Sequence, residues 1–289
     1  MQFLVYILAY PILWFISILP FRIFYWFSDC VYFLVYYILG YRKKTVRENL
    51  ALTLPHLNNE QRKTIEKKFY QHMCDMFLEM IKTMSISPEE MGKRFTVTNI
   101  EVIRDYEQKG KSIVLFASHY ASWEWLLSLT KKLKFKAIGV YKKLANPYFD
   151  KLIREIRSKY GTELVSTKET IPLMAQNQRD GILALYGLAS DQSPKYDRIF
   201  HWNNFMGIEV PVHTGAEMLA KKYDASVMFI KVKKIKRGYY EATFIPICDN
   251  PKEYENFDIT EIYLREVEKQ ILEAPEYYLW THKRWKHRR

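Results

Sequence analysis

A strand-length segment that ends at a histidine most constrains how this chain folds. Residues 113–117 read Ile-Val-Leu-Phe-Ala, an uncharged apolar run of the length of a buried strand. Ser118 and His119 break the run, and residues 121–133 then follow a helical pattern. The sequence therefore predicts a strand that passes directly into a helix, with His119 at the junction.

The same alternation recurs along most of the chain. An amphipathic helix is expected at residues 60–84, where apolar side chains recur at spacings of three and four. Further strands are expected at 136–140, 163–166, 181–186, 225–233 and 239–247, and further helices at 147–160, 171–177, 212–223 and 258–272. Alternating elements indicate an α/β fold with a mixed sheet covered by helices. His119 and Asp191 both follow expected strands, where sites of such sheets collect.

Glu124 lies five residues after His119, one turn into the expected helix. A residue in the turn before a helix can lean over its first turn, so we expect the Glu124 carboxylate to contact the imidazole. Such a carboxylate fixes the tautomer and raises the basicity of a general base acting on a hydroxyl. The alternative is a polar histidine with an ordinary partner and a glutamate favoured by the helix dipole.

The N-terminal residues 1–41 are predicted to anchor the chain in a membrane. Residues 3–21 carry no charge, and the apolar character resumes after Arg22 and again after Asp29. Two arrangements remain open, one spanning helix followed by an interfacial helix, or a helical hairpin. A cleaved signal peptide is not expected, because no basic n-region precedes the apolar run. The basic flank at residues 42–47 predicts that residues 42–289 lie on the cytoplasmic side.

Charge and motif content narrow the function. The net charge of +12 calls for a polyanionic partner, either nucleic acid or an anionic membrane surface. No phosphate-binding glycine loop and no G-x-S-x-G elbow is present. The three cysteines lack paired spacing, and His201 and His213 lack metal-ligand spacing, so we expect neither a disulfide nor a metal site. A base without an enzyme nucleophile fits direct attack by a substrate hydroxyl on an activated acyl group.

Four segments resemble the late lipid A acyltransferases, the lauroyl and myristoyl transferases of lipopolysaccharide biosynthesis. His119 to Glu124 matches the family's H-x-x-x-x-(D/E) signature, and residues 146–150, Asn-Pro-Tyr-Phe-Asp, resemble its N-P-x-F-D segment. Residues 189–192, Ala-Ser-Asp-Gln, resemble its D-Q turn, and residues 274–285 resemble its A-P-E-Q-Y-x-W-x-H-(R/K)-R-(F/W) ending. With the apolar N-terminus, the resemblance covers nearly the whole chain.

The resemblance implies a glycerolipid-acyltransferase-like fold and a membrane-bound O-acyltransferase at the bacterial inner membrane. The expected donor is an acyl thioester, acyl-acyl carrier protein or acyl-CoA, with no cofactor, and the expected acceptor is a lipid A precursor. Backbone amides after His119 are the expected oxyanion donors. The catalytic residues expected are His119, Glu124 and Asp191, and the substrate-binding residues are Arg154, Arg157, Lys142, Asn146 and Gln192. Of the two arginines, Arg154 is preferred as the phosphate ligand.

Other interpretations stay open. The acceptor could be an aminolipid or another glycolipid, and Asp191 could simply be a turn residue. The basic tail, residues 283–289, could contact anionic headgroups or the acidic carrier protein. A basic nucleic-acid-binding module and a family member that has lost catalysis are the rivals from other classes; no nucleic-acid motif is present.

Overall fold

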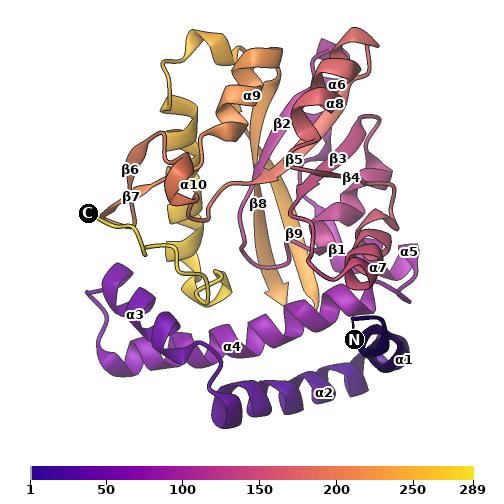
Figure 1. Ribbon diagram of the computed structural model, residues 1–289, viewed down its shortest axis with the longest axis vertical. Helices are drawn as coiled ribbons and strands as arrows, with labels where there is room; N and C mark the ends of the chain where they lie inside the picture. The colour runs from indigo at the N-terminus through magenta and orange to yellow at the C-terminus, as the bar shows by residue number, and fades with distance from the viewer. Residues whose placement is uncertain (1) are drawn as a thin grey trace.

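A seven-stranded sheet forms the centre of the computed structural model, which describes residues 2–289 (Figure 1). Its spatial order is β1-β9-β8-β2-β5-β3-β4. Strands β8, β2, β5, β3 and β4 are parallel, whereas β9 and β1 run the opposite way, so the prediction of a mixed sheet is confirmed. The strands are β1 Phe95–Val97, β2 Ile113–Ala117, β3 Lys136–Tyr141, β4 Glu163–Ser166, β5 Ala184–Ala189, β8 Ser226–Lys236 and β9 Tyr239–Cys248; a separate hairpin pairs β6 Trp202–Phe205 with β7 Ile208–Pro211.

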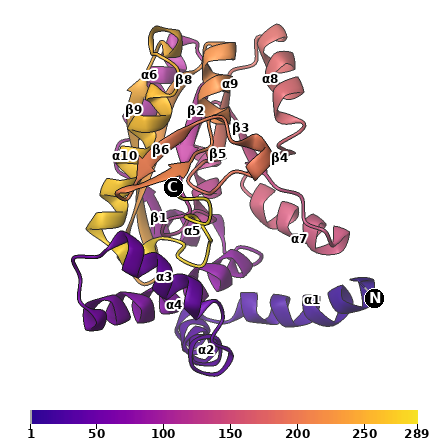
Figure 2. The same cartoon turned by 60° about the vertical axis from the view of Figure 1, so that its left-hand side comes forward.

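Helices flank this sheet and extend below it (Figures 1 and 2). They are α1 Gln2–Ile18, α2 Phe21–Phe33, η1 Leu34–Leu39, α3 Lys43–Thr53, α4 Asn59–Lys82, α5 Pro88–Arg94, α6 Ile100–Lys109, η2 Trp125–Lys132, α7 Pro147–Ser158, α8 Thr170–Arg179, η3 Tyr196–Arg198, α9 Gly215–Tyr223, η4 Pro251–Glu253, α10 Asp258–Glu273 and η5 Pro275–Tyr277. The amphipathic helix expected at 60–84 is confirmed as α4, which begins at a capping box formed by Asn58 and Gln61.

The two faces of the sheet are covered by different elements. On one face, which we call the α10 face, Phe116 stacks on Tyr263 of α10 and Asn177 of α8 donates to the Tyr186 hydroxyl. Because side chains alternate along a strand, residues such as Leu115 and Gly187 point to the opposite face. η2 covers this opposite face, which we call the η2 face, since a Cβ at Gly139 would lie 3.6 Å from Leu127 Cδ2.

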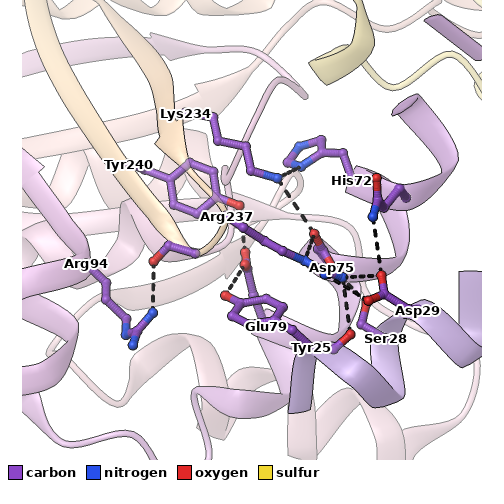
Figure 3. A network of polar contacts seen from close by, with 12 residues as sticks. Tyr25, Ser28, Asp29, His72, Asp75, Glu79, Arg94, Lys234, Arg237 and Tyr240 are labelled. Atoms are coloured by element: carbon purple, nitrogen blue, oxygen red, sulfur yellow. Dashed lines mark hydrogen bonds and ion pairs between the residues drawn. The ribbon is translucent and has the colours of Figure 1, made fainter. Parts of the chain in front are cut away.

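A buried polar network joins the N-terminal helices to the sheet (Figure 3). α4 crosses the foot of the β8–β9 hairpin, and Asp75 of α4 accepts hydrogen bonds from Arg237 in the hairpin turn and from Ser28 of α2. Glu79, one helical turn further, accepts hydrogen bonds from the hydroxyls of Tyr25 and Tyr240, both at 2.8 Å. The network therefore holds α2 against both α4 and the sheet.

Gly238 makes the close approach of α2 to this hairpin possible. Its φ of 73° lies in the left-handed region that glycine tolerates best. A Cβ at this position would come within 2.9 Å of the Tyr25 Cζ atom and 3.0 Å of Arg94 Nη1. Both backbone geometry and space thus require glycine at the turn.

The apolar N-terminus forms helices that are too short to span a bilayer singly. Within residues 2–289, no helix by itself has the length and apolar character needed; only the pair Phe21–Leu39 and Lys43–Thr53, bent by 91°, meets that criterion together. α1 is apolar but has only 17 residues. Membrane anchoring through residues 1–41, by one spanning helix with an interfacial helix or by a hairpin, therefore stays a prediction.

Several element boundaries differ from those expected. The helix expected at 121–133 is a turn followed by η2, because Ala121 has a φ of 49° and leaves the helical path. β5 begins at Ala184 instead of residue 181, since Gly181, with a φ of 66°, belongs to the turn after α8. The helix expected at 212–223 begins only at Gly215, after the β6–β7 hairpin.

Candidate active site

His119 and Asp191 form a hydrogen-bonded pair where β2 and β5 end. Nδ1 of His119 lies 2.7 Å from Oδ1 of Asp191, and the backbone amide of His119 donates to Oδ2 at 3.1 Å. The Asp191 side chain is 1% exposed and the His119 side chain 22% exposed. These bonds fix the ring and direct Nε2 away from the carboxylate, toward any substrate that enters.

The sheet register explains why two residues so distant in sequence meet. β2 and β5 are parallel neighbours, and Ala117 lies opposite Ala189, so both chains leave the sheet at the same level. His119 is the second residue after β2 and Asp191 the second after β5. The carboxyl edge of the sheet therefore brings the imidazole and the carboxylate together.

The pair is electrostatically matched. Burial lowers the pKa of His119, but the charge of Asp191 and its hydrogen bond outweigh this, and the pKa lies above the ordinary value of 6.5. Burial raises the pKa of Asp191, yet the imidazole and the hydrogen bonds from His119 bring it below 3.8. Asp191 thus stays ionised while His119 gains basicity, as general-base catalysis requires.

Glu124 does not pair with His119, which corrects the expectation from the sequence. Its carboxylate binds the guanidinium of Arg157 in a bidentate ion pair, with Nε at 2.8 Å and Nη2 at 2.6 Å. The turn at Ala121 redirects the chain, so that Glu124 faces α7. Glu124 still adds a smaller electrostatic contribution that raises the pKa of His119, after that of Asp191. The ring of Trp123 contacts the imidazole of His119 edge-on, with the two ring centroids 5.3 Å apart.

A cavity of about 1150 Å³ opens beside this site. His119, Glu124 and Arg157 line it together with many aliphatic side chains from β3, β5, η2 and α9. Its size and apolar lining suit a hydrocarbon chain better than a sugar or a nucleotide alone. The site thus places a base and a cation at a largely apolar cavity.

The model of one protein family, described as bacterial lipid A biosynthesis acyltransferase, matches residues 1–287. This chain belongs to that family. It is 25% identical over 284 residues to the lipid A biosynthesis lauroyltransferase of Escherichia coli K12, an alignment that covers 97% of this chain and 91% of the relative. The lipid A biosynthesis myristoyltransferase of the same organism is 20% identical over 148 residues, covering 51% of this chain and 46% of the relative.

The predicted substrate-binding residues of this acyltransferase occupy different environments. Arg157 and Lys142 line the cavity, as does Gln192 beside Asp191. Arg154, the arginine preferred from the sequence, is exposed and does not line the cavity, because it lies on the solvent side of α7. Asn146 caps α7, accepting hydrogen bonds from the amides of Tyr148 and Phe149. The structure therefore favours Arg157 over Arg154 as a contact for substrate.

The oxyanion donors expected after His119 are only partly available in the acyltransferase. The Ala121 amide already donates to the Tyr277 carbonyl at 3.0 Å, and no helix begins there.

The two histidines considered as metal ligands lie in different surroundings. His213 lines the cavity, while the ring of His201 stacks on that of Phe257 with the ring centroids 4.1 Å apart.

The C-terminal segment, residues 274–285, clasps the turn that carries His119, a role that the sequence did not reveal. The Leu279 amide donates to the His119 carbonyl at 3.1 Å, and Tyr120 forms a bridge with Tyr278. The charge of Asp191 contributes, after burial, to raising the pKa of Tyr278, while burial lowers the pKa of His282 to about 4.

Part of the basic tail belongs to the interior, contrary to the expectation of a surface contact. Arg284 is fully buried, and its Nη1 donates to the Pro211 carbonyl at 2.9 Å. Trp285 is also buried and stacks on Trp280. Arg284 and Trp285 of the motif at residues 274–285, which resembles the family's ending, are therefore packed in the interior near Asp191.

Proposed function

We propose that this acyltransferase moves a fatty acyl chain from an acyl thioester to a hydroxyl group of a lipid A precursor. The observation that carries the proposal is the His119–Asp191 pair beside an apolar cavity of about 1150 Å³. Family membership supports the acyl-transfer chemistry and the choice of acceptor. The active-site chemistry requires only the side chains described above and a thioester co-substrate.

In the proposed mechanism His119 Nε2 accepts the proton of the acceptor hydroxyl as its oxygen attacks the thioester carbonyl carbon. A tetrahedral intermediate forms with the charge on the former carbonyl oxygen. The carbon–sulfur bond then breaks, and the thiolate leaves with the proton returned by the imidazolium. Asp191 stabilises that imidazolium and fixes its tautomer, as the buried carboxylate does in a catalytic triad. No covalent enzyme intermediate is involved.

We assign acceptor phosphate binding to the Glu124–Arg157 pair. The ion pair uses Nε and Nη2, which leaves Nη1 of Arg157 outside it. Guanidinium suits phosphate because of its planar array of donors. Glu124 orients Arg157 at the cavity, so Glu124 acts as a positioning residue. Lys142, which is exposed at the same cavity, adds a second positive charge.

We propose that the protein binds the cytoplasmic side of the inner membrane through the outer surfaces of α1, α2 and η1. This surface exposes large apolar side chains, among them Leu8 at 72%, Trp26 at 68% and Ile38 at 65%. Monomeric soluble proteins rarely expose so contiguous an apolar surface. At 1.5 Å per residue, α1 is roughly 25 Å long, shorter than the ~30 Å hydrocarbon core, so it fits an interfacial position.

The proposed membrane surface also lies next to the cavity. Tyr6 of α1 packs against Phe149 of α7 with ring centroids 5.7 Å apart, and Figure 2 shows α1 extending beneath α7. Leu144, just before α7, is exposed and lines the cavity. A lipid acceptor in the cytoplasmic leaflet would therefore approach the cavity that holds His119 from the side of Leu144.

The decisive experiment is mass spectrometry of lipid A from cells that lack the gene. Complementation with the wild type should restore one secondary acyl chain, and His119→Ala should not. Arg154→Ala, a charge removal outside the cavity, is the matched control and should restore it. A change confined to another lipid class would be consistent with acyl transfer but would refute the proposal that a lipid A precursor is the acceptor. Full complementation by His119→Ala would refute the mechanism.

A further inference from the structure

We propose that Gly187 sets the length of the donor acyl chain that the protein accepts, because its missing side chain leaves one branch of the cavity open at its level in the sheet. This inference deepens the proposed function and rests on it for the identity of the ligand. It concerns the hydrocarbon part of the donor, whereas the reacting carbonyl lies at His119. The argument starts from how the cavity is divided.

The cavity is divided by the sheet, since its lining comes from both faces. On the η2 face it is lined by Leu115, Gly139 and Gly187 below, and by Leu126 and Leu127 of η2 above. On the α10 face it is lined by Leu188 and Ile138 of the sheet, together with residues of α8 and α9. The two branches meet over the carboxyl edge, where His119 and Gln192 lie.

Polarity distinguishes the two branches. Apart from the Glu124–Arg157 ion pair beside η2, the η2 branch is lined mostly by aliphatic side chains, and its Thr130 and Thr162 are hydrogen-bonded to each other at 2.6 Å. The α10 branch also includes His213 and Lys222, which suit a polar headgroup. A hydrocarbon chain is therefore expected in the η2 branch, where it leaves no buried polar group without a partner.

Two glycines lie side by side in the sheet beneath the η2 branch. Gly139 of β3 and Gly187 of β5 are register partners, so both lack a side chain at the same level. A Cβ at Gly139 would come 3.0 Å from Leu164 Cδ2, so Gly139 is already covered. At Gly187 the nearest atom to a Cβ is the Ile138 carbonyl oxygen at 3.7 Å, an ordinary contact. A side chain at Gly187 would therefore fit the backbone and project into the cavity.

Gly187 lies part-way along the branch. It is opposite Leu115, four residues before His119, and the branch continues past it to Leu185 and Ala137. At about 3.3 Å per residue, Gly187 is roughly 13 Å below the base along the strand. A long chain whose carbonyl lies at His119 would pass this level, whereas a short chain would end before it. Occupying the space above Gly187 should thus exclude long chains and spare short ones.

The test measures binding of a series of non-hydrolysable acyl-pantetheine thioethers, from octanoyl to palmitoyl, by the full-length protein in detergent. Gly187→Leu should lose affinity for the longer chains by about 10-fold or more for each methylene that no longer fits. Gly187→Ala should shift the same preference by a smaller step. Leu127→Ala, which enlarges the branch from above, should shift it toward longer chains.

Gly92→Leu is the matched control, because Gly92 lies in α5 with no atom within 4 Å of its added Cβ and does not line the cavity. Its length preference should equal that of the wild type. Equal preferences in Gly187→Leu and wild type, with circular dichroism showing both folded, would overturn the inference. Because binding needs no turnover, a wild type that binds these probes but transfers no acyl group would refute the proposed function and leave this result valid.

Discussion

Two buried carboxylates of this acyltransferase, Asp75 and Asp191, differ in what their partners leave accessible. Asp75, at 1% exposure, is enclosed by Ser28, Arg237 and Lys234, with its ion pairs at 2.7 Å and 3.7 Å (Figure 3). Asp191 is equally buried, but its partner His119 turns a second nitrogen toward a cavity. The first cluster closes on itself and joins elements, while the second leaves one basic atom for a substrate.

The difference shows how a buried charge is kept reactive. A buried carboxylate is stable only when it is paired and hydrogen-bonded. In the Asp75 cluster the partners are the cations of Arg237 and Lys234 and the hydroxyl of Ser28, so the charge is neutralised within the cluster. At Asp191 the partner is a titratable ring, so the same requirement raises basicity. The choice of partner, more than burial, separates a site that joins elements from one that presents a basic nitrogen to a cavity.

The largest expected effect is at the reactive cluster. His119→Ala should lower kcat with an acyl thioester by about 10²–10⁴-fold, because positioned general-base catalysis contributes that much. The kcat of Asp191→Asn should fall by a factor in the same range, since this variant loses the charge that orients and stabilises the imidazolium. Because His119→Ala also leaves the buried Asp191 without its imidazole partner, kcat is compared per folded molecule, with folding checked by circular dichroism. If both variants kept activity within tenfold of the wild type, the His119–Asp191 pair would not supply the general base, and the contrast with the Asp75 cluster would be lost.

At the closed cluster, Arg237→Met should lower the free energy of unfolding by about 3 kcal/mol. The substitution leaves Asp75 buried without its main cation, a penalty typical of broken buried pairs. Urea unfolding at pH 7 measures it, with Lys233→Met in the neighbouring exposed position of β8 as control. Activity per folded molecule should stay near that of the wild type. A selective loss of activity without loss of stability would mean that this cluster is catalytic too.

Glu79 should make stability depend on pH. Burial, followed by the charge of Asp75, raises the pKa of Glu79 to about 7. A carboxyl group with a raised pKa holds its proton in the folded state, so the free energy of unfolding should fall as pH rises from about 4.5 to 7, by about 2–3 kcal/mol. Glu79→Gln should flatten this slope in denaturation curves taken at several pH values. An unchanged slope in this variant would mean that groups other than Glu79 cause the pH dependence of stability.

The smallest effect concerns the pH profile of catalysis. Because the pKa of His119 is raised and the neutral ring is the base, kcat/KM of the wild type should rise with an inflexion above pH 6.5. In Asp191→Asn the carboxylate is lost while burial, which lowers the pKa, remains. Its residual activity should therefore show an inflexion at lower pH than that of the wild type. A shift in the opposite direction would contradict the assigned pairing.

The sequence predicted the position of His119 better than the residue with which it pairs. Strand-length apolar runs and their alternation with helices identified β2, β3 and β4 and placed His119 at a carboxyl edge. Spacing alone favoured Glu124 as the partner, since it is close in sequence. Asp191 is chosen instead by the pairing of β2 with β5, a long-range register that no local pattern encodes.

Other features escaped because their signals were weak or tertiary. The β6–β7 hairpin turns at Met206 and Gly207, both with positive φ, and methionine is an unusual residue at such a turn. Burial of Arg284 ran against the usual exposure of arginine. Arg157 and Arg154 differ only in which side of α7 faces Glu124, and that depends on how the helix packs on the sheet.

The clasp formed by residues 274–285 gives this enzyme a built-in order of assembly. The turn that carries His119 is synthesised well before Leu279, which binds its backbone and lies 160 residues later in the chain. A nascent chain that has not yet reached Leu279 therefore lacks the brace that fixes this turn. The site around His119 is thus complete only after residues 274–285 have folded against it.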